Sequence, residues 1–105
     1  MTSNILILTT TGTRDEAQKI ARALVEQQLA ACVNILPQIH SIYRWQGKVD
    51  EADECLLLIK TVASNFERVR DTIRQLHSYD LPECLSLAID NGSSEYLNWI
   101  ADSVK

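Results

Sequence analysis

The chain has 105 residues, of which 46% are hydrophobic and 23% are charged, and its net charge is −4. A chain of this length has room for one core, so we expect a single domain over residues 1–105. The acidic charge argues against a nucleic-acid partner, because binding to a phosphate backbone requires a basic face.

Cysteine usage and the N-terminal stretch bear on the compartment. Cys32, Cys55 and Cys84 are widely spaced, form no CxxC motif and adjoin apolar residues, so we expect buried, reduced thiols. Such usage is typical of a reducing compartment. The apolar run at 5–8 is too short for a signal-peptide core or a membrane span. The sequence therefore predicts a cytoplasmic protein without membrane contact.

The first elements are a strand and a helix. Residues 5–11 are rich in β-branched side chains and predict a central strand that ends at Gly12. Thr13 and Glu16 have the spacing of a reciprocal capping box, which predicts a helix at about 14–30. The apolar positions of this helix recur at helical spacing: Ala17, Ile20, Ala21, Leu24 and Val25.

A long hairpin is expected next, with strands at 32–45 and 48–62. Gln46-Gly47 predicts the turn, although a slightly longer loop is an alternative because Gln resists positive φ. Pro37 cannot donate to a ladder, so the first strand should bend there or lie at an edge. A solvated, edge-protecting role is expected for the acidic residues of the second strand: Asp50, Glu51, Asp53 and Glu54.

The last third predicts a helix, a strand and a short helix. Ser64 and Glu67 suggest a second capping box before a helix at about 65–77. A strand at 84–89 and an amphipathic helix at 94–104 follow. The order β-α-β-β-α-β predicts a ferredoxin-like α+β fold: an antiparallel sheet with helices on one face, a long hairpin and an extra C-terminal helix.

The hairpin is too long for one small domain. At 3.3 Å per residue a strand over 32–45 extends roughly 43 Å, whereas a compact domain of this length spans about 30 Å. An isolated ribbon is marginal in water, and the segment at 56–59 is apolar on both faces. Neighbouring copies of the chain would cover both features, which favours a cyclic homo-oligomer with an odd number of subunits.

Several segments, spread in order over nearly the whole chain, match one protein family. They are AACVNI at 30–35, SIYRWQGKV at 41–49, LLLIKT at 56–61, HSY at 77–79, LPE at 81–83 and YLNWI at 96–100. Together they resemble the CutA family of divalent-ion tolerance proteins. The resemblance implies a ferredoxin-like fold and a tight trimer, with an architecture similar to that of the PII signalling proteins. It also implies a role in the tolerance of divalent metals, notably copper.

The resemblance carries over the metal pattern of the family only in part. Some members have a cysteine near the end of the first strand and a His-His pair later; Thr9 and Leu76 replace the cysteine and the first histidine here. His77 remains, although Ser78 stands where proline is usual, and Glu83 is a second candidate ligand for copper or another divalent cation. The alternative for His77 is a structural hydrogen bond at the end of a helix. No cofactor is required.

The resemblance also implies clefts between the subunits of a homotrimer. Tyr43 and Trp45 are expected at the trimer interface, while Lys60, Tyr79 and Trp99 would line a cleft for a small anion or metabolite. An interface of aromatics and an ion pair is the alternative. Two functions follow: a non-catalytic metal-tolerance trimer, or a PII-like signalling or scaffold trimer that binds a metabolite or a partner protein.

Enzymatic functions find no support in the sequence. It has no GxSxG, no HExxH and no phosphate-binding glycine loop. Acylphosphatases share the expected topology, but their glycine-rich arginine loop is replaced by residues 9–13. An RNA-recognition domain would require aromatic strands on a basic sheet. The chain is therefore predicted not to be an enzyme.

Overall fold

The computed structural model describes residues 2–105 and contains the predicted elements in the predicted order. They are β1 (Asn4–Thr11), α1 (Arg14–Glu26), β2 (Cys32–Trp45), β3 (Lys48–Val62), a 3₁₀ turn (Ala63–Asn65), α2 (Phe66–Leu76), β4 (Leu85–Ala88) and α3 (Ser94–Asp102). None of the helices in the described part of the chain has the length and apolar character needed to cross a membrane.

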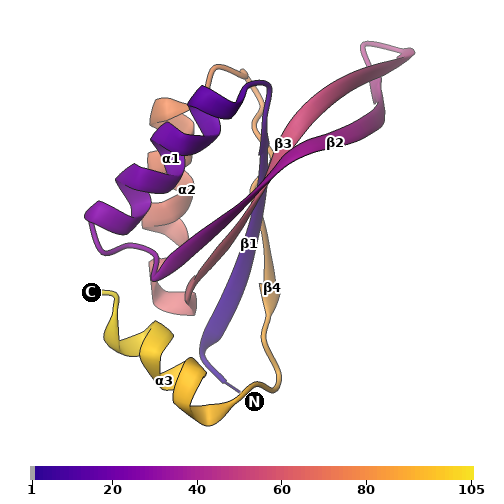
Figure 1. Ribbon diagram of the computed structural model, residues 1–105. Coiled ribbons are helices and arrows are strands. Elements are labelled where there is room, and N and C mark those ends of the chain that lie inside the picture. The colour runs from indigo at the N-terminus through magenta and orange to yellow at the C-terminus, as the bar shows by residue number, and fades with distance from the viewer. Residues whose placement is uncertain (1) are drawn as a thin grey trace.

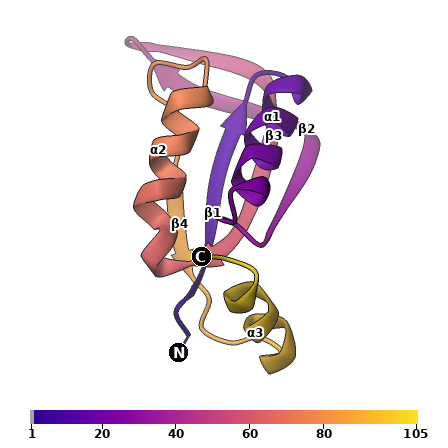
Figure 2. The ribbon, with the colours of Figure 1, turned by 90° about the vertical axis from the view of Figure 1, so that its left-hand side faces the viewer.

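The strands form one antiparallel sheet in the order β2-β3-β1-β4. Helices α1 and α2 cover one face of this sheet, and α3 packs at the end where the N-terminus lies (Figures 1 and 2). This arrangement confirms the predicted ferredoxin-like α+β fold. The core lies between the sheet and the two helices, and its largest fully buried aliphatic side chains are Ile7, Ile20, Leu24, Leu57, Ile59, Ile73 and Val69.

The start of α1 follows only half of the capping-box prediction. The Thr13 hydroxyl accepts a hydrogen bond from the backbone N–H of Glu16 at 3.2 Å, as expected of an N-cap. The Glu16 carboxylate does not reach back to Thr13; it accepts from the backbone N–H of Ser78 at 2.9 Å. The reciprocal bond was a wrong prediction, because the loop after α2 offers this carboxylate another donor.

Two other helix boundaries differ from the prediction. Helix α1 ends at Glu26, and Gln28 then adopts a left-handed φ of 59° that stops the helix short of residue 30. The second capping box was a wrong prediction: Ser64 lies within the 3₁₀ turn, and Asn65 becomes the N-cap. The Asn65 side chain makes no cap bond and instead donates to the buried carbonyl of Leu29 at 3.2 Å.

The hairpin of β2 and β3 projects well beyond the other elements (Figure 1), and the molecule measures 44 Å along its longest axis. Its turn has two residues, Gln46 and Gly47, with φ of 50° and 78°, so the longer loop is not used. The pairing register shifts between Leu36 and Ile39, which places a bulge at Pro37 on the edge strand. The expected bend and overhang are both confirmed.

The sheet face opposite α1 and α2 carries a row of leucines, hereafter the outer leucine face. Cross-strand partners share a face, and the register places Leu8 beside both Leu58 and Leu85. Several of these side chains stay substantially exposed, with 56% for Leu85 and 47% for Leu87. The members of the outer leucine face are Leu6, Leu8, Leu36, Leu56, Leu58, Leu85 and Leu87.

Candidate functional site

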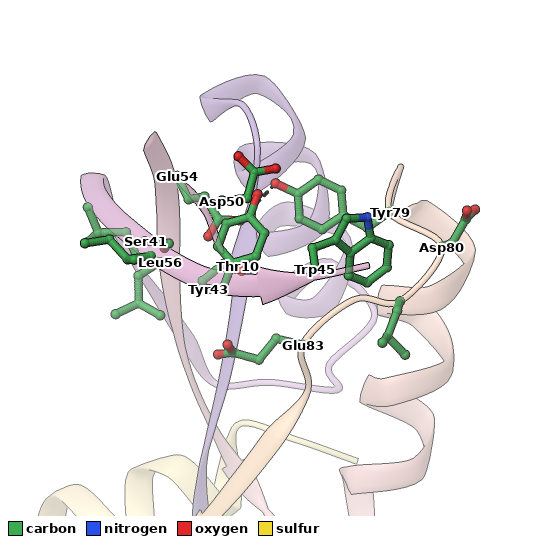
Figure 3. A pocket seen from close by; sticks show the side chains of 13 residues that line it. Thr10, Ser41, Tyr43, Trp45, Asp50, Glu54, Leu56, Tyr79, Asp80 and Glu83 are labelled. Carbon is green, nitrogen blue, oxygen red and sulfur yellow. Dashed lines mark hydrogen bonds between the residues drawn. The ribbon is translucent and has the colours of Figure 1, made fainter. Parts of the chain in front are cut away.

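A cavity of about 730 Å³ lies between the outer half of the hairpin and the loop from α2 to β4 (Figure 3). We call it the acidic pocket. Among the described residues that line it, none is basic. Its charged and aromatic lining residues are Asp50, Glu54, Asp80, Glu83, Tyr43, Trp45 and Tyr79.

The hairpin turn decides which side chains face this pocket. Tyr43 pairs with Asp50 and Ile39 pairs with Glu54, and all four line the pocket. Alternation along the strand sends the intervening acidic residues to the other face of the ribbon. The acidic run of β3 is therefore divided between the two faces of the ribbon.

Tyr79 joins the loop to the hairpin. Its hydroxyl donates to Glu54 Oε2 at 2.9 Å, and burial together with the Glu54 carboxylate raises the pKa of Tyr79 to about 12. Gly12 makes room for this ring, since a Cβ at that position would lie 3.1 Å from the Tyr79 hydroxyl oxygen. The phenol therefore stays protonated and serves as a hydrogen-bond donor to Glu54.

Glu83 comes from the segment just before β4 and lines the pocket on the other side of the Tyr43 ring from Glu54 (Figure 3). Partial burial raises the pKa of its carboxyl group above the ordinary value, and the negative charge of Glu54 adds to this. Two carboxylates of the pocket therefore repel each other. Any positive charge that enters between them would relieve this repulsion.

His77, the other candidate metal ligand, does not line the acidic pocket. Its side chain is fully buried, with Nε2 lying 2.6 Å from the carbonyl oxygen of Thr10. Its Nδ1 accepts the backbone N–H of Tyr79 at 3.0 Å, which assigns the proton to Nε2. Both ring nitrogens thus have protein partners, and a metal ion at Nδ1 would have to displace the Tyr79 N–H.

The three residues expected in a ligand cleft fall into two places. Lys60 donates to the Tyr96 hydroxyl at 3.3 Å, and the Tyr96 and Trp99 rings lie 5.4 Å apart. Lys60 pairs with Cys32 at the far end of the hairpin, whereas Tyr79 lines the acidic pocket. A cleft that unites Lys60, Tyr79 and Trp99 is not formed within one chain and stays a prediction about the assembly.

A histidine on the hairpin was not among the predicted site residues. His40 lies between two solvent-exposed carboxylates of the acidic run: its Nδ1 is 2.9 Å from Asp53 and its Nε2 is 2.6 Å from Glu51. The hydrogen bond to Asp53, followed by that to Glu51, raises the pKa of His40 above its ordinary value of 6.5. Counting back from the Gln46-Gly47 turn places His40 opposite Asp53, so the sequence contained the necessary signal.

This arrangement predicts a pH-dependent contribution of His40 to stability. Because the folded pKa is raised, the stabilisation should be fully present below pH 6.5 and should disappear as the pH rises through the folded pKa. Urea unfolding of wild type and His40→Gln over pH 5–9 would measure it. The difference in free energy of unfolding should shrink toward high pH; a difference independent of pH would contradict the prediction.

Comparison with known proteins identifies the family. The family model of the CutA1 divalent ion tolerance protein matches residues 5–103. This chain belongs to the CutA1 family. The "Divalent-cation tolerance protein CutA" of Thermus thermophilus is 46% identical over 98 residues, which cover 93% of this chain and 95% of that protein. Human "Protein CutA" is 46% identical over 84 residues, or 80% of this CutA1 chain but 47% of the human protein.

Solved structures agree with the family assignment. The T. thermophilus protein superposes with a TM-score of 0.95 at 44% identity, covering 97% of this CutA1 chain and 99% of that chain. The Archaeoglobus fulgidus protein superposes with a TM-score of 0.94 at 38% identity, with the same two coverages. These relatives are named as tolerance proteins and not as enzymes.

The prediction of a cytoplasmic location is wrong, because a relative in the CutA1 family contradicts it. The A. fulgidus structure is described as the periplasmic divalent cation tolerance protein CutA. The prediction relied on unpaired cysteines, but Cys55 is buried and Cys32 and Cys84 are half-buried. Thiols in such positions behave as small apolar side chains, and their use does not report the compartment.

Proposed function

We propose that this CutA1 family protein supports tolerance of divalent cations by binding them weakly, without catalysis, as a homotrimer. The observation that carries this proposal is the family match over residues 5–103. The net charge of −4 and the carboxylates of the acidic pocket also favour cations over anions. The divalent ion is the cargo of the protein in this proposal.

The donor set of one chain is incomplete. Among residues 2–105, no group of three or more His, Cys, Asp or Glu side chains is placed to hold a metal ion. Copper binding by His77 and Glu83 would therefore need further ligands from water or from another subunit. His77 would contribute Nδ1 at the expense of its hydrogen bond from Tyr79.

The homotrimer is supported by the apolar surface of one chain. The outer leucine face is uncovered, and the hairpin exposes 40% of Tyr43 and 46% of Trp45. The edges of β2 and β4 also lack partner strands in the sheet. Subunits arranged around an axis would cover the face, the edges and the overhanging ribbon together.

Calorimetric titration of the purified protein with Cu²⁺ tests the metal role. We expect saturable binding that weakens in His77→Gln and in Glu83→Gln, with circular dichroism confirming that each variant is folded. Glu67→Gln, which removes an exposed carboxylate on α2, is the matched control and should bind like wild type. The absence of saturable binding, or equal binding by all variants, would refute the proposed metal role.

A second candidate function is a PII-like trimer that binds an anionic metabolite or a partner protein. The cluster of Lys60, Tyr96 and Trp99 favours it, because it presents an ammonium group beside exposed aromatic rings. This candidate predicts that Lys60→Ala abolishes anion binding and leaves the oligomer intact. A screen of anionic metabolites that finds no ligand would count against it.

A further inference from the structure

The segment that joins β4 to α3 contains an Asn-Gly pair, Asn91-Gly92, which neither proposed function uses. Both residues are exposed and lie outside the helices and strands. The segment runs past the end of the sheet where the N-terminus lies, away from the tip of the hairpin (Figure 1). It is therefore not part of the hairpin, the outer leucine face or the strand edges, which are the surfaces expected between subunits.

No hydrogen bond holds the two groups of this pair that can react with each other. Within the described part of the chain, the backbone N–H of Gly92 and the side-chain amide of Asn91 have no hydrogen-bond partner. Glycine also lacks the Cβ that would hinder the approach of its nitrogen to the preceding side chain. The Gly92 nitrogen can therefore reach Cγ of Asn91 without breaking any part of the fold.

The structure separates Asn91 from the other four asparagines of the chain. Asn4 and Asn65 are buried, and their side-chain amides donate to backbone carbonyls. Asn34 lies within β2 and Asn98 lies within α3, where regular structure fixes the backbone. Of the asparagines in residues 2–105, only Asn91 combines a following glycine with an exposed, irregular backbone.

We infer that Asn91-Gly92 is a site of spontaneous deamidation. The Gly92 nitrogen attacks Cγ of Asn91 and forms a C–N bond, while the side-chain nitrogen takes up the Gly92 amide proton and leaves as ammonia. Water then opens the five-membered imide at one of its two carbonyl groups, which yields aspartate or isoaspartate at position 91. Water is the only co-reactant, and the reaction is independent of both proposed functions.

Isoaspartate at this position disturbs the start of α3. Gly92 lies against Leu97, since a Cβ on Gly92 would come within 3.1 Å of the Leu97 side chain. The Leu97 carbonyl accepts a hydrogen bond from the Asn4 side chain at 3.0 Å, and Ile100 of the same helix is buried. Isoaspartate adds a methylene group to the backbone, which shifts Gly92 relative to this anchored helix. The modification therefore loosens α3 from the end of the sheet.

Peptide mapping of the purified protein, incubated at pH 8, tests the site. Trypsin releases residues 75–105 as one peptide, because no Lys or Arg lies between Arg74 and Lys105. Fragment masses should show the change from amide to carboxyl at Asn91 and no change at Asn98, which is an internal control in the same peptide. Asn91→Gln should remove the reaction, because the corresponding six-membered imide forms far more slowly. An unmodified Asn91, or equal reaction at Asn98, would overturn the inference.

The rate of the reaction tests whether the fold leaves the pair unrestrained. A synthetic peptide with the sequence of residues 87–96 provides the reference rate under the same conditions. We expect the folded protein to react within tenfold of the peptide rate. A folded protein that reacts more than tenfold more slowly would show that the fold restrains the pair, and would overturn the inference.

Hydrogen exchange tests the effect on α3. The isoaspartate form separates from the unmodified protein on anion exchange, and its amides over residues 94–102 should exchange at least tenfold faster, while those of α1 stay unchanged. Asn91→Asp is the matched control, since it adds the charge without lengthening the backbone, and it should exchange like wild type. Equal exchange in the isoaspartate form and the unmodified protein, or equal acceleration in Asn91→Asp, would contradict the loosening of α3.

Discussion

Replacing His77 with alanine is expected to lower the free energy of unfolding by about 2–4 kcal/mol. The side chain is fully buried and its ring lies 4.6 Å from the Tyr79 ring. The substitution leaves a cavity and removes the partners of the Thr10 carbonyl and the Tyr79 N–H. Both of these groups would then lack their hydrogen bonds. Urea unfolding at one fixed protomer concentration, without added metal, measures the loss.

Gln75→Ala is the matched control, since Gln75 is an exposed residue on the same helix. It should change the free energy of unfolding by less than about 0.5 kcal/mol. A His77→Ala protein as stable as this control would show that the buried hydrogen bonds contribute nothing. A loss that appears only in the presence of metal would assign His77 to metal binding in place of architecture.

The long elements of the fold were predictable because their patterns extend over many residues. Strands β2 and β3 have the bounds expected from composition, and Gln46-Gly47 fixes their register close to the turn. Pro37 also predicted a bend or an edge position, because a residue without an N–H has few places in a sheet, and the structure has a bulge there on the edge strand. Each of these signals is local, so no knowledge of the rest of the fold is needed to interpret it.

The helix caps show where local signals fail. Thr13 and Glu16 have capping-box spacing, but Ser78, 62 positions later, competes for the Glu16 carboxylate. Asn65 likewise turns toward the buried carbonyl of Leu29 and away from its own helix. In both cases a tertiary partner outcompetes the local one, and the spacing of the sequence does not report tertiary partners.

The individual residues of the candidate site were predicted, but their grouping in one pocket was not. Tyr43, Trp45, Tyr79 and Glu83 were singled out individually, and the structure brings all four to one pocket. What unites them is the path of the loop after α2, which folds back against the hairpin. Within one chain Lys60 lies beside Tyr96 and outside this pocket, so the pocket is acidic; a cleft that also includes Lys60 stays a prediction about the assembly.

Replacing Leu87 with lysine is expected to convert the oligomer into single chains. Leu87 is 47% exposed on the outer leucine face, opposite Leu6 and away from the core. If this face packs against another subunit, the substitution places an ammonium group without a counterion in an apolar contact. Because the oligomer is symmetric, the same unfavourable contact occurs at every interface between subunits. Light scattering coupled to gel filtration should give three chains for wild type and one for Leu87→Lys.

Val25→Lys is the matched control, because Val25 is a similarly exposed apolar residue, at 41%, but lies on α1. A lysine near the C-terminal end of that helix is compatible with the helix dipole, so the mass should stay at three chains. Trp45→Ala on the hairpin should weaken the oligomer without abolishing it, since the outer leucine face remains. If Leu87→Lys keeps the wild-type mass, the leucine face is not an interface. If Val25→Lys dissociates instead, the helical face takes that role.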